Sequence, residues 1–378
     1  MENLGISEMK NLITRVFSLK GTEKTLAVLT DLPPDAEADD NKWKSQRLMA
    51  SDWVETLRDA FPNMEISHVV YKSPGKNNGD LPVKCGVNIG LPSYWSSESD
   101  NDTFENIFNK VEIILAPTRY STTAPLKMAS TKYNFRAATM PGFSMEMADA
   151  LRVDYSIISA RVEFLKEMLD KADGALISFS SSGESWKFHL DLRFRKGHAS
   201  GGTFNAGPAA GNLPSGEAYI VPYEGEIANE PSFTRGLLPV QFGDEIVVYR
   251  VEGNKAVEVI TKGEMSEIED SQIKNEVAYA NIAELGLGVL GDFGIKPVGE
   301  ILLDEKLGLH IAFGRSDHFG GQVGVKDFSS PEQVIHIDRV YIPETQPLIN
   351  IDYLVLENMD GSETTLMENG KYTINFPV

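Results

Sequence analysis

The sequence predicts an α/β protein in which an N-terminal half with a largely parallel sheet precedes a β-rich half. In the first half, apolar strand-like runs alternate with amphipathic helical runs, which is typical of parallel sheets. After Ala172 most apolar runs are short and strand-like, with turn sequences such as EGNK and MDGSE between them. A chain of 378 residues is also long for one hydrophobic core. We therefore expect two domains, residues 1–170 and residues 171–378.

The elements of the N-terminal half follow one another as strand, helix, strand. Strands are expected in TLAVLTDLP, MEISHVVYK, VEIILAP and FRAATMPG. Between the first two, the run at 41–61 has large apolar residues four or five positions apart, which predicts an amphipathic helix: Trp43, Leu48, Trp53, Leu57 and Phe61. A second long helical run covers 144–172. This order predicts a Rossmann-like domain.

The C-terminal half contains strand-like segments and one substantial helical run, at 266–285. The glycines Gly286, Gly288 and Gly291 that follow match G-x-G-x-x-G, but they come after a helical pattern instead of a strand. The dinucleotide-binding context is therefore missing. We expect these glycines to form turns that let the backbone approach a site.

Charge and composition exclude several classes of function. With 55 acidic and 35 basic residues, the net charge of −20 opposes a broad nucleic-acid surface. No apolar run approaches the ~20 residues that span a bilayer, so no membrane association is expected. The start MENLGISEMK lacks the basic and apolar regions of a secretory signal, and Cys85 is the single cysteine. The expected location is cytoplasmic.

Three of the six histidines lie within Leu309–Asp338, and the last of them forms His-x-Asp. On a strand, side chains two positions apart share a face, so His336 and Asp338 are expected to project together. An imidazole beside a carboxylate suits zinc, cobalt, manganese or iron. An isolated His-x-Asp is more often a pair of half-exposed strand residues. In LHIAFG, however, His310 also shares a face with Ala312, opposite three large apolar residues, as either a core histidine or a ligand.

Two acidic residues strengthen the metal interpretation. Glu217 lies between a Pro-Ser-Gly turn and an apolar strand, and Glu284 lies among Ala, Ile, Leu and Gly. Burying a carboxylate is costly unless a cation or hydrogen bonds compensate. Together with His310, His336 and Asp338, these residues suffice to bind two divalent ions that share a bridging water.

The segments NLPSGEAYIVP, NIAELGLG, LDEKLGLHIAFG and VIHID, in this order, resemble the metal-binding segments of the aminopeptidase T and aminopeptidase S family of metallopeptidases. In the N-terminal half, KTLAVLTDLP, LAPTRYSTTAPLKMAS and ATMPGFSMEMADALRVDY are similar to that family's first domain. The resemblance implies a bilobal homodimer with two zinc or cobalt ions in the C-terminal domain. The implied metal ligands are Glu217, Glu284, His310, His336 and Asp338.

The chain departs from this family at one position. Where family members carry a tyrosine seven positions after the first metal-binding histidine, this chain has Asp317, followed by His318. That tyrosine is thought to assist the transition state, so its replacement puts peptidase activity in doubt and leaves the metal site intact. His318 lies on a glycine-rich loop, either facing the site or on the surface. The candidate catalytic residues are Glu284, His318 and Asp317.

Two enzymatic functions fit these residues. The first is a dinuclear metallo-aminopeptidase that removes N-terminal residues from short peptides, with Glu284 transferring the proton to the leaving amine. The alternative is a mononuclear Fe(II) ring-cleaving dioxygenase, in which His310, His336 and Asp338 form the facial triad. The family fold is related to a dihydroxypyridine dioxygenase of this type. A metal-bound protein without catalysis is the remaining possibility. The expected ligand in either enzyme is a short peptide or another small molecule.

Overall fold

The chain folds into two compact units in a computed structural model that describes residues 3–377. The first unit contains the described residues up to Ser159 together with Ser200–Ser215. The second contains Ala160–Ala199 and the described residues from Gly216 onward. Each unit is therefore built from two stretches of chain, whereas the sequence led us to expect two continuous domains meeting near residue 170.

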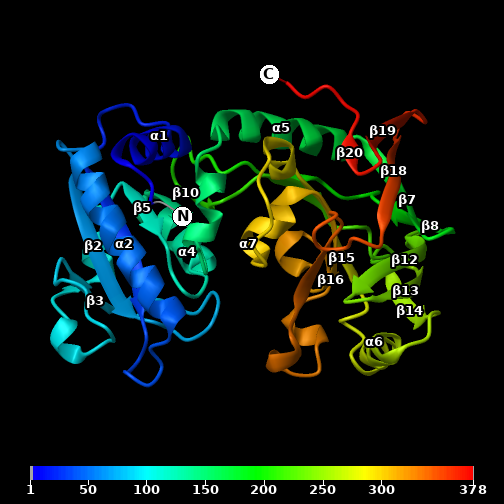
Figure 1. Ribbon diagram of the computed structural model, residues 1–378, viewed down its shortest axis with the longest axis horizontal. Helices are drawn as coiled ribbons and strands as arrows, with labels where there is room; N and C mark the ends of the chain where they lie inside the picture. Colours follow the sequence, from blue (N-terminus) through cyan, green and yellow to red (C-terminus); the bar gives the residue numbers. More distant parts are fainter. Residues whose placement is uncertain (1–2, 378) are drawn as a thin grey trace. The chain divides into compact units, whose positions relative to one another are not determined.

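The first unit is built on a seven-stranded sheet with the order β10-β6-β5-β1-β2-β3-β4 (Figure 1). The strands from β10 to β2 are parallel, and β3 and β4 continue the sheet in antiparallel fashion. Its strands are β1 (Thr25–Leu32), β2 (Glu65–Lys72), β3 (Lys84–Val87), β4 (Asp102–Thr103), β5 (Ile113–Ala116), β6 (Arg136–Thr139) and β10 (Ala209–Asn212). The predicted α/β class with a largely parallel sheet is thus confirmed.

Helices accompany this sheet because its central strands are apolar on both faces. In β1 every residue after Thr25 is buried, as expected for a parallel strand covered on two sides. The α-helices are α1 (Ile6–Phe17), α2 (Asn41–Ala60), α3 (Phe104–Phe108), α4 (Thr123–Tyr133) and α5 (Tyr155–Leu169), of which α5 continues into the second unit; the 3₁₀ turns are Ser97–Ser99 and Met145–Leu151.

The two long helices predicted from periodicity in the N-terminal half agree only partly with the observed helices. The helix α2 begins where expected, because the carboxylate of Asp40 accepts a hydrogen bond from the Trp43 amide at 2.8 Å. Leu48, however, is 51% exposed instead of buried. The run at 144–172 is a 3₁₀ turn followed by the separate helix α5, since the Asp154 carboxylate accepts a bond from the Ser156 amide and begins a new helix.

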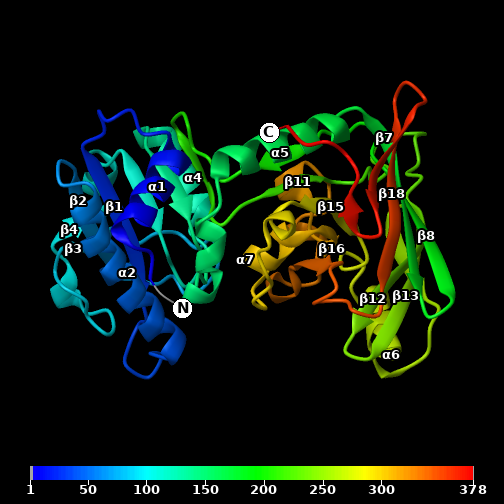
Figure 2. The ribbon, with the colours of Figure 1, turned by 45° about the horizontal axis from the view of Figure 1, so that its top comes forward.

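The second unit contains two sheets, both visible in Figure 2. The eight-stranded antiparallel sheet has the order β14-β13-β12-β8-β7-β18-β19-β20, with β7 (Ala172–Ser181), β8 (Glu184–Asp191), β12 (Arg235–Phe242), β13 (Glu245–Glu252), β14 (Lys255–Val259), β18 (Asn350–Asn358), β19 (Glu363–Glu368) and β20 (Lys371–Tyr372). The five-stranded sheet has the order β17-β16-β15-β11-β9, with β9 (His198–Ser200), β11 (Glu217–Ile220), β15 (Ile282–Gly288), β16 (Leu309–Gly314) and β17 (His336–Val340).

Helical elements connect these strands. They are α6 (Glu264–Asn275), α7 (Ile301–Asp304) and the 3₁₀ turns Leu290–Phe293, Glu305–Leu307, Asp317–Phe319, Val325–Asp327 and Pro331–Gln333. The helix predicted at 266–285 was wrong in its second half, because α6 ends at Asn275 and Ile282–Gly288 is the buried strand β15. Gly286 and Gly288 therefore lie inside a strand, not in a turn.

Aromatic contacts join the two sheets of the second unit. The ring of Phe313 on β16 lies 5.1 Å from the ring of Tyr249 on β13, and Tyr341, just after β17, lies 4.8 Å from Phe179 on β7. The Tyr341 hydroxyl also donates to the Pro239 carbonyl. One face of the five-stranded sheet is thus occupied by apolar packing, and its polar side chains project from the other face.

Within residues 3–377, no helix combines the length and the apolar character needed to cross a membrane.

Candidate metal centre

Four neighbouring strands bring the five predicted metal ligands to one face of the five-stranded sheet. The antiparallel registers place Glu284 opposite Ala312, and Ala312 opposite Asp338. His310 is two residues before Ala312 on β16, and His336 is two residues before Asp338 on β17, so both share this face. Glu217 begins β11, opposite Gly288. The strand alternation in LHIAFG and VIHID therefore predicted the facing of these side chains correctly.

Two glycines of β15 allow close approach, Gly286 to the His310 side chain and Gly288 to the Lys306 backbone. A Cβ atom at Gly286 would lie 1.8 Å from Nε2 of His310, and one at Gly288 would lie 2.3 Å from the Lys306 carbonyl carbon. The His310 ring therefore occupies the space that a side chain at position 286 would need. These glycines serve close approach within the sheet, which is a different role from the turn expected from the sequence.

The ligand atoms form two groups that share Glu284. Glu217, Glu284 and His310 offer one group, and Glu284, His336 and Asp338 offer the other, with the ligand atoms of each within 4.8 Å of one another. One oxygen of Glu284 lies 3.3 Å from His310 Nε2, and its other oxygen lies 3.4 Å from His336 Nε2. Glu284 thus lies between the two histidines, as a carboxylate bridging two ions would.

Each group contains one buried carboxylate oxygen that lacks a hydrogen bond from any described residue. These atoms are Oε2 of Glu217 and Oδ1 of Asp338. Their nearest ring nitrogens, on His310 and His336, are 3.5 Å and 3.4 Å away. A buried acceptor without a donor is costly, and a cation would satisfy it. This observation fits one ion in each group.

The remaining ring nitrogens are oriented by backbone carbonyls. Nδ1 of His336 lies 2.8 Å from the Arg315 carbonyl oxygen, and Nδ1 of His310 lies 3.3 Å from that of Gly308. A proton on Nδ1 can donate to these carbonyls, which leaves Nε2 free to bind a metal ion. Both histidines are therefore presented in the tautomer that a ligand requires.

The carboxylates hold the two histidines in their charged form when no ion is bound. Burial acts to lower the pKa of His310, but its hydrogen bond to Glu284 and the charges of Asp338 and Glu284 raise that pKa to about 9. The pKa of His336 is also raised, since Asp338 and Glu284 outweigh the effect of burial. Burial acts to raise the pKa of Glu284, but hydrogen bonds from the two histidines lower it.

Because His310 is protonated at neutral pH in the metal-free protein, a divalent ion must displace that proton. We expect the affinity for Zn²⁺ or Co²⁺ to increase between pH 6.5 and about 9, by about tenfold per pH unit for each proton released. Calorimetric titration across this range measures the slope. His189→Gln removes a histidine that pairs with Glu357 outside the site and should leave the slope unchanged. A pH-independent affinity would contradict the assignment of His310 as a ligand.

A buried lysine, which the sequence analysis did not single out, adjoins the first group. Nζ of Lys306 donates to Oε1 of Glu217 at 2.5 Å and also to the carboxylate of Glu305, and its side chain is 2% exposed. Burial acts to lower the pKa of Lys306, but Glu217 and Glu305 raise it, so the lysine is charged. It binds one oxygen of Glu217 and leaves Oε2 facing His310.

The loop after β16 lies beside the second group. The ring of His318 is 5.4 Å from the ring of His336, and burial together with the charge of His336 lowers the pKa of His318 to about 4. His318 is therefore neutral at pH 7 and close enough to act beside the site. The carboxylate of Asp317 instead accepts a bond from Arg315 Nε at 2.6 Å. Of the two predicted loop residues, His318 therefore lies against the candidate ligand His336, whereas Asp317 pairs with Arg315.

An aromatic residue that the sequence analysis did not single out, Tyr219, lies beside the first group. Tyr219 is two residues after Glu217 on β11, and burial, Glu217 and Glu284 all raise its pKa. Its ring packs against those of His198 and Phe319 at 5.1 Å and 4.9 Å. A tyrosine in an apolar strand carries no sequence signal for a site, although its i+2 spacing from Glu217 places it on the ligand face.

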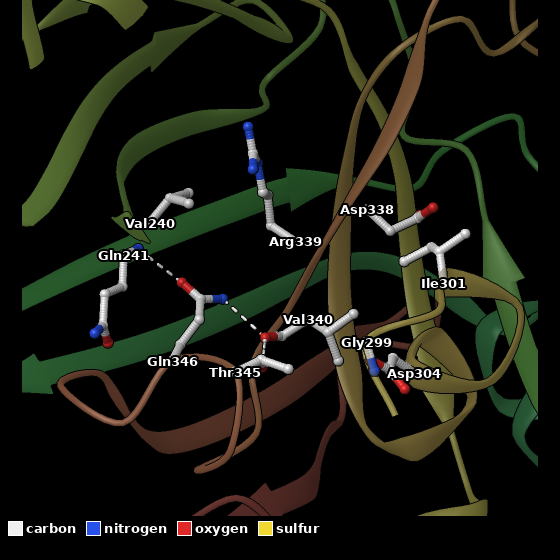
Figure 3. A pocket seen from close by; sticks show the side chains of 10 residues that line it. All are labelled: Val240, Gln241, Gly299, Ile301, Asp304, Asp338, Arg339, Val340, Thr345 and Gln346. Atoms are coloured by element: carbon white, nitrogen blue, oxygen red, sulfur yellow. Dashed lines mark hydrogen bonds between the residues drawn. The ribbon is translucent and has the colours of Figure 1, made fainter. Parts of the chain in front are cut away.

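A cavity of about 260 Å³ borders Asp338 on β17 (Figure 3). Two of the polar side chains around it are already used within the protein. The Gln346 side chain bonds to the Gln241 amide and to the Val340 carbonyl, and the carboxylate of Asp304 accepts from two backbone amides. In Figure 3 the Asp338 side chain points toward Ile301 and away from Gln346.

Neither the scan against protein-family models nor the search of curated proteins finds a match to this sequence. Two solved structures are similar over 98% of both chains. One is 2,5-dihydroxypyridine dioxygenase from Pseudomonas putida KT2440, with a TM-score of 0.60 and 14% identity. The other is wild-type AmpT, aminopeptidase T, from Thermus thermophilus, with a TM-score of 0.53 and 15% identity. The fold of this chain is therefore distantly similar to that of an aminopeptidase and also to that of a dioxygenase.

Proposed function

We propose that this protein is a dinuclear metallohydrolase that removes N-terminal residues from short peptides. The observation that carries the proposal is the pair of ligand groups that share Glu284, each with one buried oxygen lacking a donor. The similarity of the fold to AmpT is consistent with it. The three ligand carboxylates also outnumber the single adjacent lysine, so the site attracts cations even when both histidines are neutral.

The donor set fits two divalent ions of the zinc or cobalt type. Glu217 and His310 would hold the first ion, His336 and Asp338 the second, and Glu284 would bind both. Bound ions would supply an activated water at neutral pH and would polarise the scissile carbonyl. Glu284 is proposed to accept the proton of the attacking water and to pass it to the leaving amine. His318, neutral beside His336, is proposed to contact the substrate.

The acidic surroundings fit a substrate with a free α-ammonium group. Glu305 is adjacent to Glu217 through Lys306, and burial raises its pKa to about 8. A positively charged amine near this carboxyl would favour its ionised form. The proposed substrate class is therefore unblocked short peptides, and N-acetylated peptides are expected to be poor substrates. We propose a homodimer in the cytoplasm, as expected from the family resemblance and from the sequence.

The second candidate is a mononuclear Fe(II) dioxygenase that cleaves a dihydroxypyridine ring. Two observations favour it: the fold is similar to that of the Pseudomonas putida dioxygenase, and Asp317 stands where the aminopeptidase family has a tyrosine. In this case His310, His336 and Asp338 would hold one iron. The positions of the ligand atoms favour this candidate less than the dinuclear one. His310 belongs with Glu217 and Glu284 in the first group, separate from His336 and Asp338.

The two candidates are separated by metal content and substrate. The protein is purified without added metal and analysed for elements, then loaded with zinc or cobalt and incubated with di- and tripeptides and their N-acetylated forms. We expect close to two ions per chain and release of the N-terminal residue from unblocked peptides alone. One iron per chain, with oxygen consumption on 2,5-dihydroxypyridine, would replace this proposal with the second candidate.

A further inference from the structure

We propose that the hydroxyl of Tyr219 donates a hydrogen bond to the substrate oxygen that becomes negatively charged during hydrolysis. The inference rests on the proposed hydrolase function. It adds the hydrogen-bond donor that would stabilise the oxyanion in that site. A tetrahedral oxyanion needs a donor that is positioned before the reaction begins. Tyr219 meets this requirement through its place in the sheet, its fixed ring and its uncommitted hydroxyl.

The sheet places Tyr219 directly beside the first ligand group. It follows Glu217 by two residues on β11, so both side chains project from the same face. In the register it is opposite Gly286, and Gly286 is opposite His310 on the next strand. Because Gly286 has no side chain, nothing on that strand separates Tyr219 from the His310 ring in this row.

The ring of Tyr219 is held from two sides. It stacks on the His198 ring at 5.1 Å with an interplanar angle of 19°, and it contacts the edge of Phe319 at 4.9 Å. Nε2 of His198 lies 3.0 Å from the Phe319 carbonyl oxygen, which ties these two neighbours to each other. Phe319 also lies 5.6 Å from the ring of His336. The ring of Tyr219 is thus fixed beside the first ligand group, and Phe319 connects it to His336 of the second.

The Tyr219 hydroxyl has no hydrogen-bond partner among residues 3–377. Other tyrosines of the same unit are committed to structure: Tyr223, Tyr341 and Tyr372 each donate to a backbone carbonyl. A phenol is neutral at physiological pH and can donate. A free hydroxyl on a tightly packed ring, beside the ligand carboxylates of Glu217 and Glu284, is therefore more consistent with ligand binding than with a packing role alone.

Three of the other donors near the site are already occupied. Nζ of Lys306 donates to Glu217 and Glu305. The Nδ1 atoms of His310 and His336 face the carbonyls of Gly308 and Arg315. Asp317 offers a carboxylate, which accepts instead of donating when ionised. Tyr219 and the neutral His318 are therefore the donors that the site has to spare, and Tyr219 is the one beside the first ligand group.

The substitution Tyr219→Phe tests this inference, because it removes the hydroxyl and keeps the ring that packs on His198 and Phe319. In the zinc- or cobalt-loaded protein we expect kcat for dipeptide hydrolysis to fall by about 100-fold, with KM changed less than about threefold and metal content unchanged. Tyr223→Phe is the matched control: its hydroxyl bonds to Glu230 and Ile227, outside the ligand groups, and kcat should be retained.

A second readout does not depend on turnover. Leucine phosphonic acid, an α-aminophosphonate with tetrahedral anionic oxygens, is titrated by calorimetry into both metal-loaded variants and the wild type. We expect Tyr219→Phe to bind it at least tenfold more weakly than wild type, and Tyr223→Phe to bind it equally well. Equal binding and equal kcat in Tyr219→Phe would overturn the inference and leave the hydrolase proposal standing.

The remaining outcomes also decide the question. A wild type that hydrolyses no peptide but binds the phosphonate more tightly than Tyr219→Phe would support the donor and refute the peptidase function. A metal-loaded wild type that neither hydrolyses peptides nor binds the phosphonate would overturn both.

Discussion

Glu284→Gln is expected to reduce metal content from two ions toward one per chain and to lower peptide hydrolysis by orders of magnitude, about 10³-fold. The substitution keeps the shape of the side chain but removes the negative charge that lies between His310 and His336. Both ligand groups contain Glu284, so both lose a carboxylate. In the proposed hydrolase, Glu284 would hold both ions and would also be the base for the attacking water, so one change would remove both contributions.

Elemental analysis of Glu284→Gln, together with its kcat for a dipeptide, tests this prediction. Glu276→Gln is a suitable control, because Glu276 is a buried carboxylate of the same unit that accepts bonds from Ser329 instead of facing the site. A mononuclear iron enzyme would behave differently: Glu284 would then lie outside the triad, and the substitution would leave iron bound and reduce turnover by only ~10–100-fold. A Glu284→Gln protein with two ions and near wild-type hydrolysis would refute the dinuclear assignment.

Lys306→Met is expected to lower the free energy of unfolding of the metal-free protein by about 3–5 kcal/mol. The lysine is buried between Glu217 and Glu305, so its removal leaves the ionised Glu217 without its cation and Glu305 without its hydrogen-bond donor. Methionine has a similar length and apolar stem, which keeps the loss of packing small. The cost is therefore mainly that of uncompensated buried charge. Adding zinc should restore more stability to this variant than to the wild type, since an ion at Glu217 replaces part of the missing charge.

Chemical denaturation of the chelated proteins, with and without zinc, measures both effects. Lys274→Met is the matched control: it breaks an exposed pair with Asp270 on α6, and exposed pairs contribute at most about 1 kcal/mol. The double variant Lys306→Met with Glu217→Gln should lose less stability than the sum of its parts, because it removes both partners. Equal unfolding free energies for Lys306→Met and wild type would show that the lysine does not balance these acids.

The sequence predicted the positions of the five candidate ligands because strand alternation is a local rule. His310 has apolar neighbours on both sides and His336 is two residues from Asp338, so their facing follows from the period of a strand. Glu217 and Glu284 were recognisable as acids in apolar segments. The role of Lys306 was hidden, because LDEK at the end of a short helix has the character of a solvated charged run, and only the fold shows that its lysine is buried.

Longer-range features escaped prediction for a different reason. The return of Ser200–Ser215 to the first unit depends on β10 pairing in parallel with β6, about 70 residues earlier, and on Phe204 packing 5.7 Å from Phe17. No local pattern marks such a partner. Likewise, Ile282–Gly288 continues a helix-like spacing from α6, and its pairing between β11 and β16 overrides that preference.

The two glycines in β15 give the site a property that loop-built sites lack. A glycine inside a strand weakens it by roughly 0.5–1 kcal/mol relative to alanine, so the sheet is locally less stable than it would otherwise be. In return, the His310 ring is recessed among hydrogen-bonded strands, where its orientation does not depend on a loop closing first. Binding of a metal ion at Nε2 of His310 should therefore need little rearrangement of the backbone. The same recess means that position 286 of β15 does not tolerate substitution, because even alanine there would displace the imidazole of His310.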